Sequence, residues 1–191
     1  MAALPAHGGV IIAAGSVAVG AGTTGDSFDV WLTNTGPSAI LVDSFAFNIS
    51  TLDTGITFTD VTTGTVAAPY IFPSSLFGPD LTGPNSGQTF AFEPSDISGV
   101  GNVSIGSGIT VGLGHVLFDV SGGAAPGTFA VTLVKDPLVT NLSDSNANNI
   151  PIDTFTDGDI TIFLPEPATV LPAGLAFLIA AAAKRRLRTR Q

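Results

Sequence analysis

Residues 27–33 read Ser-Phe-Asp-Val-Trp-Leu-Thr, and this short stretch decides the fold class. Phe28, Val30 and Leu32 occupy every second position, and the residues between them face the other way. Because side chains alternate across a β-strand, the pattern predicts a strand with one buried face. The residues at 34–37, Asn-Thr-Gly-Pro, are typical of a turn and end the strand.

Similar runs recur along residues 10–163, and glycine and proline separate nearly all of them. Before Pro167 no segment keeps a helical period. Further strands are predicted at 40–50, 55–59, 88–92, 116–120, 128–133 and 159–163. About eight or nine short strands joined by turns predict an all-β protein, an antiparallel β-sandwich of the jelly-roll type. Residues 62–87, rich in proline and glycine, are expected to form a long loop.

Composition excludes several classes of protein. Charged residues make up only 11% of the chain and hydrophobic residues 45%, so a charge-rich disordered chain is excluded. Because there is no cysteine, disulfides, thiolate nucleophiles and cysteine-ligated zinc are excluded as well. The formal net charge of −9 argues against a nucleic-acid partner. Thirteen of the aromatic residues are phenylalanine, against one tryptophan and one tyrosine, which predicts that Phe fills the core.

The basic residues are concentrated at the C-terminus. Residues 1–183 contain 15 acidic groups and one basic group, a formal charge of −14, whereas residues 184–191 carry +5. Directly before this cluster, residues 167–183 carry no charge and, as a helix, extend about 26 Å. The pattern predicts one transmembrane helix followed by a cytoplasmic basic anchor, formed by Lys184, Arg185, Arg186, Arg188 and Arg190. The alternative is a helix buried in a soluble domain, which would have to cover apolar side chains on all its sides.

The same region resembles a known sorting signal. Pro165, Glu166 and Pro167 precede the apolar segment and the arginine-rich end, in the order and at the C-terminal position of the PEP-CTERM signal. The resemblance implies a substrate of exosortase, a membrane-embedded processing enzyme of Gram-negative bacteria that make exopolysaccharide. It also implies an inner-membrane precursor with a periplasmic ectodomain, which after processing reaches the cell surface or is secreted. The two prolines are expected to keep the motif extended and open to the enzyme.

These signals divide the chain into three parts. Residues 164–191 form the sorting signal, residues 10–163 the ectodomain, and residues 1–9 a short N-terminal remnant. The first residues lack the basic region of a signal peptide, although export requires such a peptide. We therefore expect the signal peptide to lie upstream of Met1.

The ectodomain is similar to cohesins and their carbohydrate-binding relatives in the order of its strands. The similarity is carried by residues 28–33, 45–50, 114–120, 125–131 and 157–162. It implies a jelly-roll fold. It also raises an alternative function, a cohesin-like module that binds a carbohydrate or a protein.

Residues suited to catalysis are scarce. His7 and His115 are the only histidines, and His115 lies inside a predicted strand, where a hydrogen-bonded structural role is expected. Glu93 and Asp96 flank a Pro-Ser pair, which is more typical of turn capping than of an acid pair. No phosphate-binding or dinucleotide-binding loop is present in the sequence. We therefore expect that the chain is not an enzyme.

Calcium is the one cofactor that the sequence raises; otherwise no cofactor is expected. Residues 144–148, Asp-Ser-Asn-Ala-Asn, place oxygen donors at alternate positions, as an EF-hand loop begins. The glycine and the bidentate glutamate that an EF-hand requires are missing, so that motif is excluded. A looser calcium site and ordinary solvated turns both remain open for Asp144, Asn146, Asp153, Asp157 and Asp159.

Together these features predict an exported, non-enzymatic protein of the cell surface or extracellular matrix. Its expected partners are exosortase, the inner membrane before processing, and exopolysaccharide or another surface protein, with no nucleic acid. The strongly negative charge outside the tail favours solubility and hydrated matrices.

Overall fold

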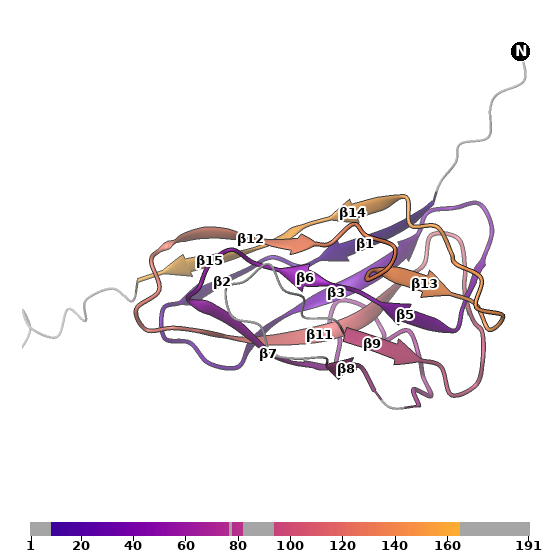
Figure 1. The fold of residues 1–191 in the computed structure, drawn as a ribbon, viewed down its shortest axis with the longest axis horizontal. Coiled ribbons are helices and arrows are strands. Elements are labelled where there is room, and N and C mark those ends of the chain that lie inside the picture. The colour runs from indigo at the N-terminus through magenta and orange to yellow at the C-terminus, as the bar shows by residue number, and fades with distance from the viewer. Residues whose placement is uncertain (1–8, 77, 82–93, 165–191) are drawn as a thin grey trace, which may run out of the picture.

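The computed structural model describes residues 9–76, 78–81 and 94–164 (Figure 1). All fifteen elements of secondary structure within these residues are β-strands. The all-β prediction is confirmed. These residues contain fifteen strand segments, more than the eight or nine expected. One reason is that the predicted strand at 40–50 is interrupted and forms three segments. The strand predicted at 88–92 lies outside the described residues.

The first layer of the sandwich is a five-stranded sheet. It contains β1 (Val10–Ala14), β3 (Asp26–Asn34), β7 (Ile56–Thr62), β11 (Thr110–Val120) and β14 (Thr154–Thr156). The strand order is β14-β1-β3-β11-β7. β3 lies at the centre and pairs antiparallel with β1 on one side and with β11 on the other, whereas β1 and β14 run parallel.

The second layer consists of two four-stranded sheets. One, in the order β2-β15-β12-β6, contains β2 (Val17–Gly20), β6 (Ile49–Ser50), β12 (Gly127–Leu133) and β15 (Gly158–Phe163). The other, in the order β13-β5-β9-β8, contains β5 (Ser44–Ala46), β8 (Asp80–Leu81), β9 (Pro94–Ile97) and β13 (Asn141–Ser143). A separate antiparallel pair joins β4 (Ile40–Val42) to β10 (Val103–Ile105).

The two sheets of the second layer are continuous through the junction of β5 and β6. Only Phe47 and Asn48 separate these strands, and both extend a ladder. The backbone N–H of Phe47 donates to the carbonyl of Pro94 at 3.0 Å, and the carbonyl of Asn48 accepts from Val134 at 2.9 Å. The chain therefore passes from one sheet to the other without leaving the layer.

The core is formed by the alternating apolar residues, as the sequence predicts. Phe28, Val30 and Leu32 are all buried. The ring of Phe28 packs against Phe58 and Phe118, with centroid separations of 6.1 and 5.9 Å. Phenylalanine is confirmed as a main filler of the core, because these rings belong to one continuous cluster of buried side chains.

The terminal strands cross from one layer to the other together. β1 and β14 are parallel neighbours in the first layer, and the strands that follow them, β2 and β15, are parallel neighbours in the second. Gly15 and Gly158 lie at the two crossing points, and a Cβ on Gly158 would stand only 2.1 Å from the carbonyl oxygen of Gly15. Only glycine allows the two backbones to approach so closely.

The loop after β7 extends the first layer along β11. Gly112 donates its N–H to the carbonyl of Pro69 at 2.8 Å and accepts from the N–H of Ile71 at 2.8 Å. A Cβ on Gly112 would collide with the side chain of Thr65. The expected long loop is confirmed for residues 63–76, where glycine at position 112 lets it lie against the strand. The prediction of a loop over all of 62–87 is wrong at residues 80–81, which form β8.

Gly158→Ala is expected to lower the free energy of unfolding by about 2–3 kcal/mol, because the added methyl group collides with the carbonyl of Gly15. Gly122→Ala is the matched control, since no atom beyond its two chain neighbours lies within 4 Å of the position that an added Cβ would occupy, and it is expected to change stability by less than about 0.5 kcal/mol. Urea unfolding followed by Trp31 fluorescence measures both. Equal stabilities of the two variants would contradict the crossing.

Candidate functional site

The outer surface of the second layer carries two hollows, and we call this surface the grooved face. The first hollow, of about 490 Å³, lies between β6 and β12 and is lined by Ser50, Thr51, Leu52, Asp53, Thr128, Phe129, Ala130 and Thr132. The second, of about 380 Å³, lies along β5 and β9 and is lined by Ser44, Phe45, Ala46, Gly78, Ser95, Asp96, Ile97 and Asn141. β5 borders the second hollow and β6, the next strand in the chain, borders the first, so the two hollows are adjacent along the chain.

The first hollow combines apolar contact with hydroxyl groups. Leu52 is 81% exposed, and Phe129, which lines the same hollow, is half-buried. Thr128 and Thr132 project exposed hydroxyls from β12 on the same side. Asp53 supplies one carboxylate, whose Oδ1 accepts from the N–H of Gly55 at 2.5 Å. This arrangement suits binding of an amphipathic surface.

A hydrogen bond between the partly buried Tyr70 and the buried Asp96 lies at the base of the second hollow. The hydroxyl of Tyr70 donates to Oδ2 of Asp96 at 2.5 Å, and Asp96 also accepts from the N–H of Ile97. Burial raises the pKa of the Tyr70 hydroxyl far above its ordinary value, and the bond to Asp96 and the negative charge of Asp96 raise it further. The rings of Phe45 and Phe72 pack against Tyr70 at centroid distances of 6.4 and 6.3 Å.

The turn predicted around Asp96 is wrong. Residues Pro94–Ile97 form β9, and Asp96 points inward from that strand. Local preference disfavours aspartate in strands, but here Tyr70 supplies a buried donor that compensates for the loss of water. Glu93 lies outside the described residues.

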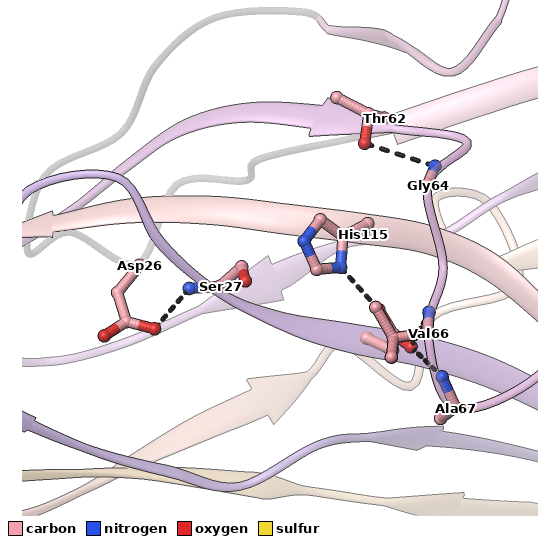
Figure 2. Close-up of polar contacts among 8 residues, drawn as sticks. Asp26, Ser27, Thr62, Gly64, Val66, Ala67 and His115 are labelled. Carbon is pink, nitrogen blue, oxygen red and sulfur yellow. Dashed lines mark hydrogen bonds and ion pairs between the residues drawn. The ribbon is translucent and has the colours of Figure 1, made fainter.

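On the opposite layer, His115 forms a hydrogen bond with Asp29. Nδ1 of His115 lies 2.6 Å from Oδ1 of Asp29, and Oδ2 of Asp29 accepts from the backbone N–H groups of Val66 and Ala67 at 2.7 and 2.6 Å. Figure 2 shows the imidazole between Ser27 and the backbone at Val66 and Ala67. The sequence-based expectation that His115 is hydrogen-bonded inside a strand is confirmed.

The residues considered for calcium are distributed over separate parts of the fold. In the turn after β13, Oδ1 of Asp144 accepts from the N–H groups of Asn146 and Asn148, both at 2.9 Å, and Ala147 adopts a φ of 60°. The side-chain and backbone hydrogen bonds from Asn148, with those from Asn146, hold the pKa of Asp144 below its usual range. This carboxylate therefore stabilises its own turn.

The other acidic candidates also have local roles. Oδ2 of Asp153 accepts from the N–H of Val10 at 2.9 Å, and Oδ1 of Asp157 accepts from the N–H of Leu133 at 2.9 Å. Asp159 is exposed on β15. Within residues 9–76, 78–81 and 94–164, no group of three or more acidic or histidine side chains is arranged to hold a metal ion. Calcium binding stays a prediction.

The sorting motif, Pro165, Glu166 and Pro167, and the basic residues at 184–190 lie outside the described residues. In the part of the chain that the structure describes, no helix is long and apolar enough to cross a membrane. β15 ends at Phe163, and Leu164 after it is 58% exposed. The described chain therefore ends on the surface, directly before the motif.

Several residues of these sites carry no local signal in the sequence. Asp29 is separated from His115 by 86 positions, and Tyr70 from Asp96 by 26. Both pairs form only once the register of the sheets is set. One signal in the sequence could have pointed to Tyr70, which is the only tyrosine of the chain. A tyrosine that is removed from water usually hydrogen-bonds its hydroxyl group to a partner.

No protein-family model and no curated protein matches the sequence. Solved structures do match. A non-cellulosomal cohesin from Archaeoglobus fulgidus aligns with a TM-score of 0.55 at 20% identity, over 84% of this chain and 95% of the cohesin. The chain has the cohesin fold. Its similarity to solved cohesins covers 84% of the chain, so the jelly-roll prediction is confirmed for the part of the chain that the structure describes.

Two bacterial cohesins of known structure match the chain with similar TM-scores and coverage. The structure of a type I cohesin–dockerin complex from Clostridium thermocellum matches with a TM-score of 0.59 at 13% identity, over 81% of this chain and 99% of that one. The seventh ScaB type I cohesin of Pseudobacteroides cellulosolvens matches with a TM-score of 0.56 at 15% identity, over 84% and 96%. At these identities the cohesin likeness describes the fold alone.

The hydrogen bond between Tyr70 and Asp96 predicts a loss of stability at high pH. Because the pKa of Tyr70 is higher in the folded chain than in the unfolded one, its contribution is complete below about pH 10 and declines as the pH rises further. Tyr70 is the only tyrosine, so phenolate absorbance reports this group alone. The absorbance is expected to rise together with unfolding.

Tyr70→Phe is expected to remove that alkaline step and to lower the free energy of unfolding by about 1–3 kcal/mol, since Asp96 loses a buried donor. Combining it with Asp96→Leu is expected to restore part of the loss. If Tyr70 titrated near its ordinary pKa while the chain was still folded, the hydrogen bond between Tyr70 and Asp96 would be contradicted.

Proposed function

We propose that this chain is a non-enzymatic, cohesin-like module that binds a protein partner outside the cell. The observation that carries the proposal is the cohesin fold, which accounts for 81–84% of this chain and nearly the whole length of the solved cohesins. One of those structures is a cohesin–dockerin complex, that is, a cohesin bound to another protein. Binding of a protein therefore fits the fold better than a passive structural role.

The grooved face is the surface that we assign to the partner. It presents an apolar centre at Leu52 and Phe129 with a rim of threonine hydroxyls, which is the composition of a partner-binding patch. Ile97 adds a second apolar contact in the neighbouring hollow, where it is 39% exposed. Phe129 and the exposed Leu52 supply the apolar surface that a partner would bury in this hollow.

Charge restricts the partner further. Lys135 is the only lysine or arginine among the described residues, which also contain thirteen aspartates. Such a surface attracts basic partners, tolerates neutral ones and repels acidic ones. The proposed partner is therefore an extracellular protein with an apolar, neutral or basic contact surface.

The sorting signal completes the proposal. β15 ends at Phe163 and Leu164 is 58% exposed, so the described chain reaches the surface at the residue where the proposed signal begins. We propose that residues 164–191 anchor the precursor in the inner membrane and that exosortase processes it, delivering the module to the cell surface or its exopolysaccharide.

Binding is tested by immobilising the full-length chain in detergent, identifying by mass spectrometry the extracellular protein that it retains, and measuring the affinity for the purified partner. Leu52→Asp is expected to weaken that affinity at least about tenfold, because a charge enters the apolar centre of the face. Leu138→Asp is the matched control, since Leu138 is 85% exposed and lines neither hollow. Equal affinities of the two variants, or binding only to glycans on an array, would refute the assignment.

Sorting is tested by producing the full-length chain in cells with and without exosortase and locating the mature C-terminus by mass spectrometry. We expect cleavage near Pro165–Pro167 only when exosortase is present, and its loss in Glu166→Ala. Leu164→Ala serves as the control outside the three-residue motif. Identical full-length C-termini in both cell lines would disprove sorting while leaving the binding module untouched.

A further inference from the structure

A third hollow, of about 410 Å³, lies on the outer surface of the first layer, on the other side of the sandwich from the grooved face. The crossing between β1 and β2 forms one wall, β3 and β11 form the base, and the loop after β7 forms the rim. Its lining includes Gly15, Ser16, Ser27, Trp31, Val66 and His115. Neither the sorting signal nor the grooved face involves these residues.

The hydrogen bonds of Asp29 determine which ring nitrogen of His115 is available. A carboxylate accepts only, and Oδ2 of Asp29 is already occupied by the N–H groups of Val66 and Ala67. Oδ1 therefore accepts a hydrogen bond from the N–H at Nδ1 of His115, with 2.6 Å between the oxygen and the nitrogen. In the neutral imidazole this leaves a lone pair on Nε2. Asp29 is 6% exposed and His115 22%, so a buried carboxylate holds a partly open acceptor in a fixed orientation.

The rest of the hollow is apolar or carries hydroxyl groups. Trp31 is half-buried on the same face of β3 as Asp29, and Val66 is 83% exposed on the rim. Ser27 projects from β3 on the side of the imidazole away from the Val66–Ala67 backbone, as Figure 2 shows. An indole beside an oriented acceptor and a hydroxyl fits a ligand with an apolar face and hydroxyl donors at its edge.

We propose that this hollow binds a neutral saccharide, which packs its C–H face against Trp31 and donates a hydroxyl hydrogen to Nε2 of His115. Ser27 supplies a second hydroxyl contact. Anionic saccharides are disfavoured, because the described residues carry thirteen aspartates and a single lysine. The site goes beyond the proposed protein-binding function, since it lies on the other layer and recognises a different class of ligand.

The single tryptophan of the chain makes the site directly observable. The full-length chain, in a detergent without a sugar headgroup, is titrated with maltohexaose, cellohexaose and chitohexaose, and with polygalacturonate as the anionic comparison. Because Trp31 is the only tryptophan, any change in indole emission reports this hollow. We expect a saturable change with at least one neutral oligosaccharide and none with polygalacturonate.

Two variants test the contacts. His115→Phe keeps an aromatic ring but removes the acceptor, and Val66→Arg fills the rim at a position exposed enough to leave folding intact. Each is expected to weaken saccharide binding at least about tenfold. Leu52→Asp, on the grooved face, is expected to bind saccharide like the unaltered chain, which separates this site from the proposed protein-binding surface.

Three results would overturn the proposal: no emission change with any neutral oligosaccharide, a change with polygalacturonate alone, or unaltered binding in Val66→Arg. If His115→Phe fails to fold, Val66→Arg and Ser27→Ala decide the question, because both positions lie on the hollow and neither side chain is part of the buried core.

Discussion

The paired crossing of the terminal strands is the constraint on which the rest of the structure depends. β1 continues into β2, and β14 into β15, at points where Gly15 and Gly158 touch backbone to backbone. The N–H of Gly15 also donates to the carbonyl of Asp29 at 2.8 Å, which ties the crossing to the central strand. Because the chain passes from the first layer to the second at both points, the crossing holds the two layers together over one core. The crossing between β1 and β2 also forms a wall of the third hollow.

Among the residues that the structure describes, the buried carboxylates are Asp29 and Asp96, and each has a defined set of hydrogen-bond donors. Asp29 accepts from His115 and two backbone amides, and Asp96 accepts from Tyr70 and the backbone of Ile97. Full hydrogen bonding offsets the cost of removing these groups from water. As a result each outer surface has a fixed base, and the two faces present different chemistry: apolar and threonine-rich on one side, indole and imidazole on the other.

The sequence predicts what is local and misses what depends on register. Alternation at Phe28–Leu32 is a property of five consecutive residues, so the strand and its buried face could be recognised directly. The interruption of the strand at 40–50 could not be predicted from the sequence. It depends on distant residues, because Phe47 bonds to Pro94 in one sheet and Asn48 bonds to Val134 beside the other. The same holds for the pairing of His115 with Asp29. Cohesin similarity was visible in the order of strands, and the solved cohesins confirm that fold.

Native-state hydrogen exchange of β15 tests the central claim most directly. If the terminal strands close the sandwich, backbone amides of β15 that bond to β12 or β2 will exchange only through global unfolding, as slowly as those of β11. Fast exchange of β15 while β11 stays protected would mean that the crossing is a peripheral attachment, and the account of how the two layers and their outer surfaces are held would fail.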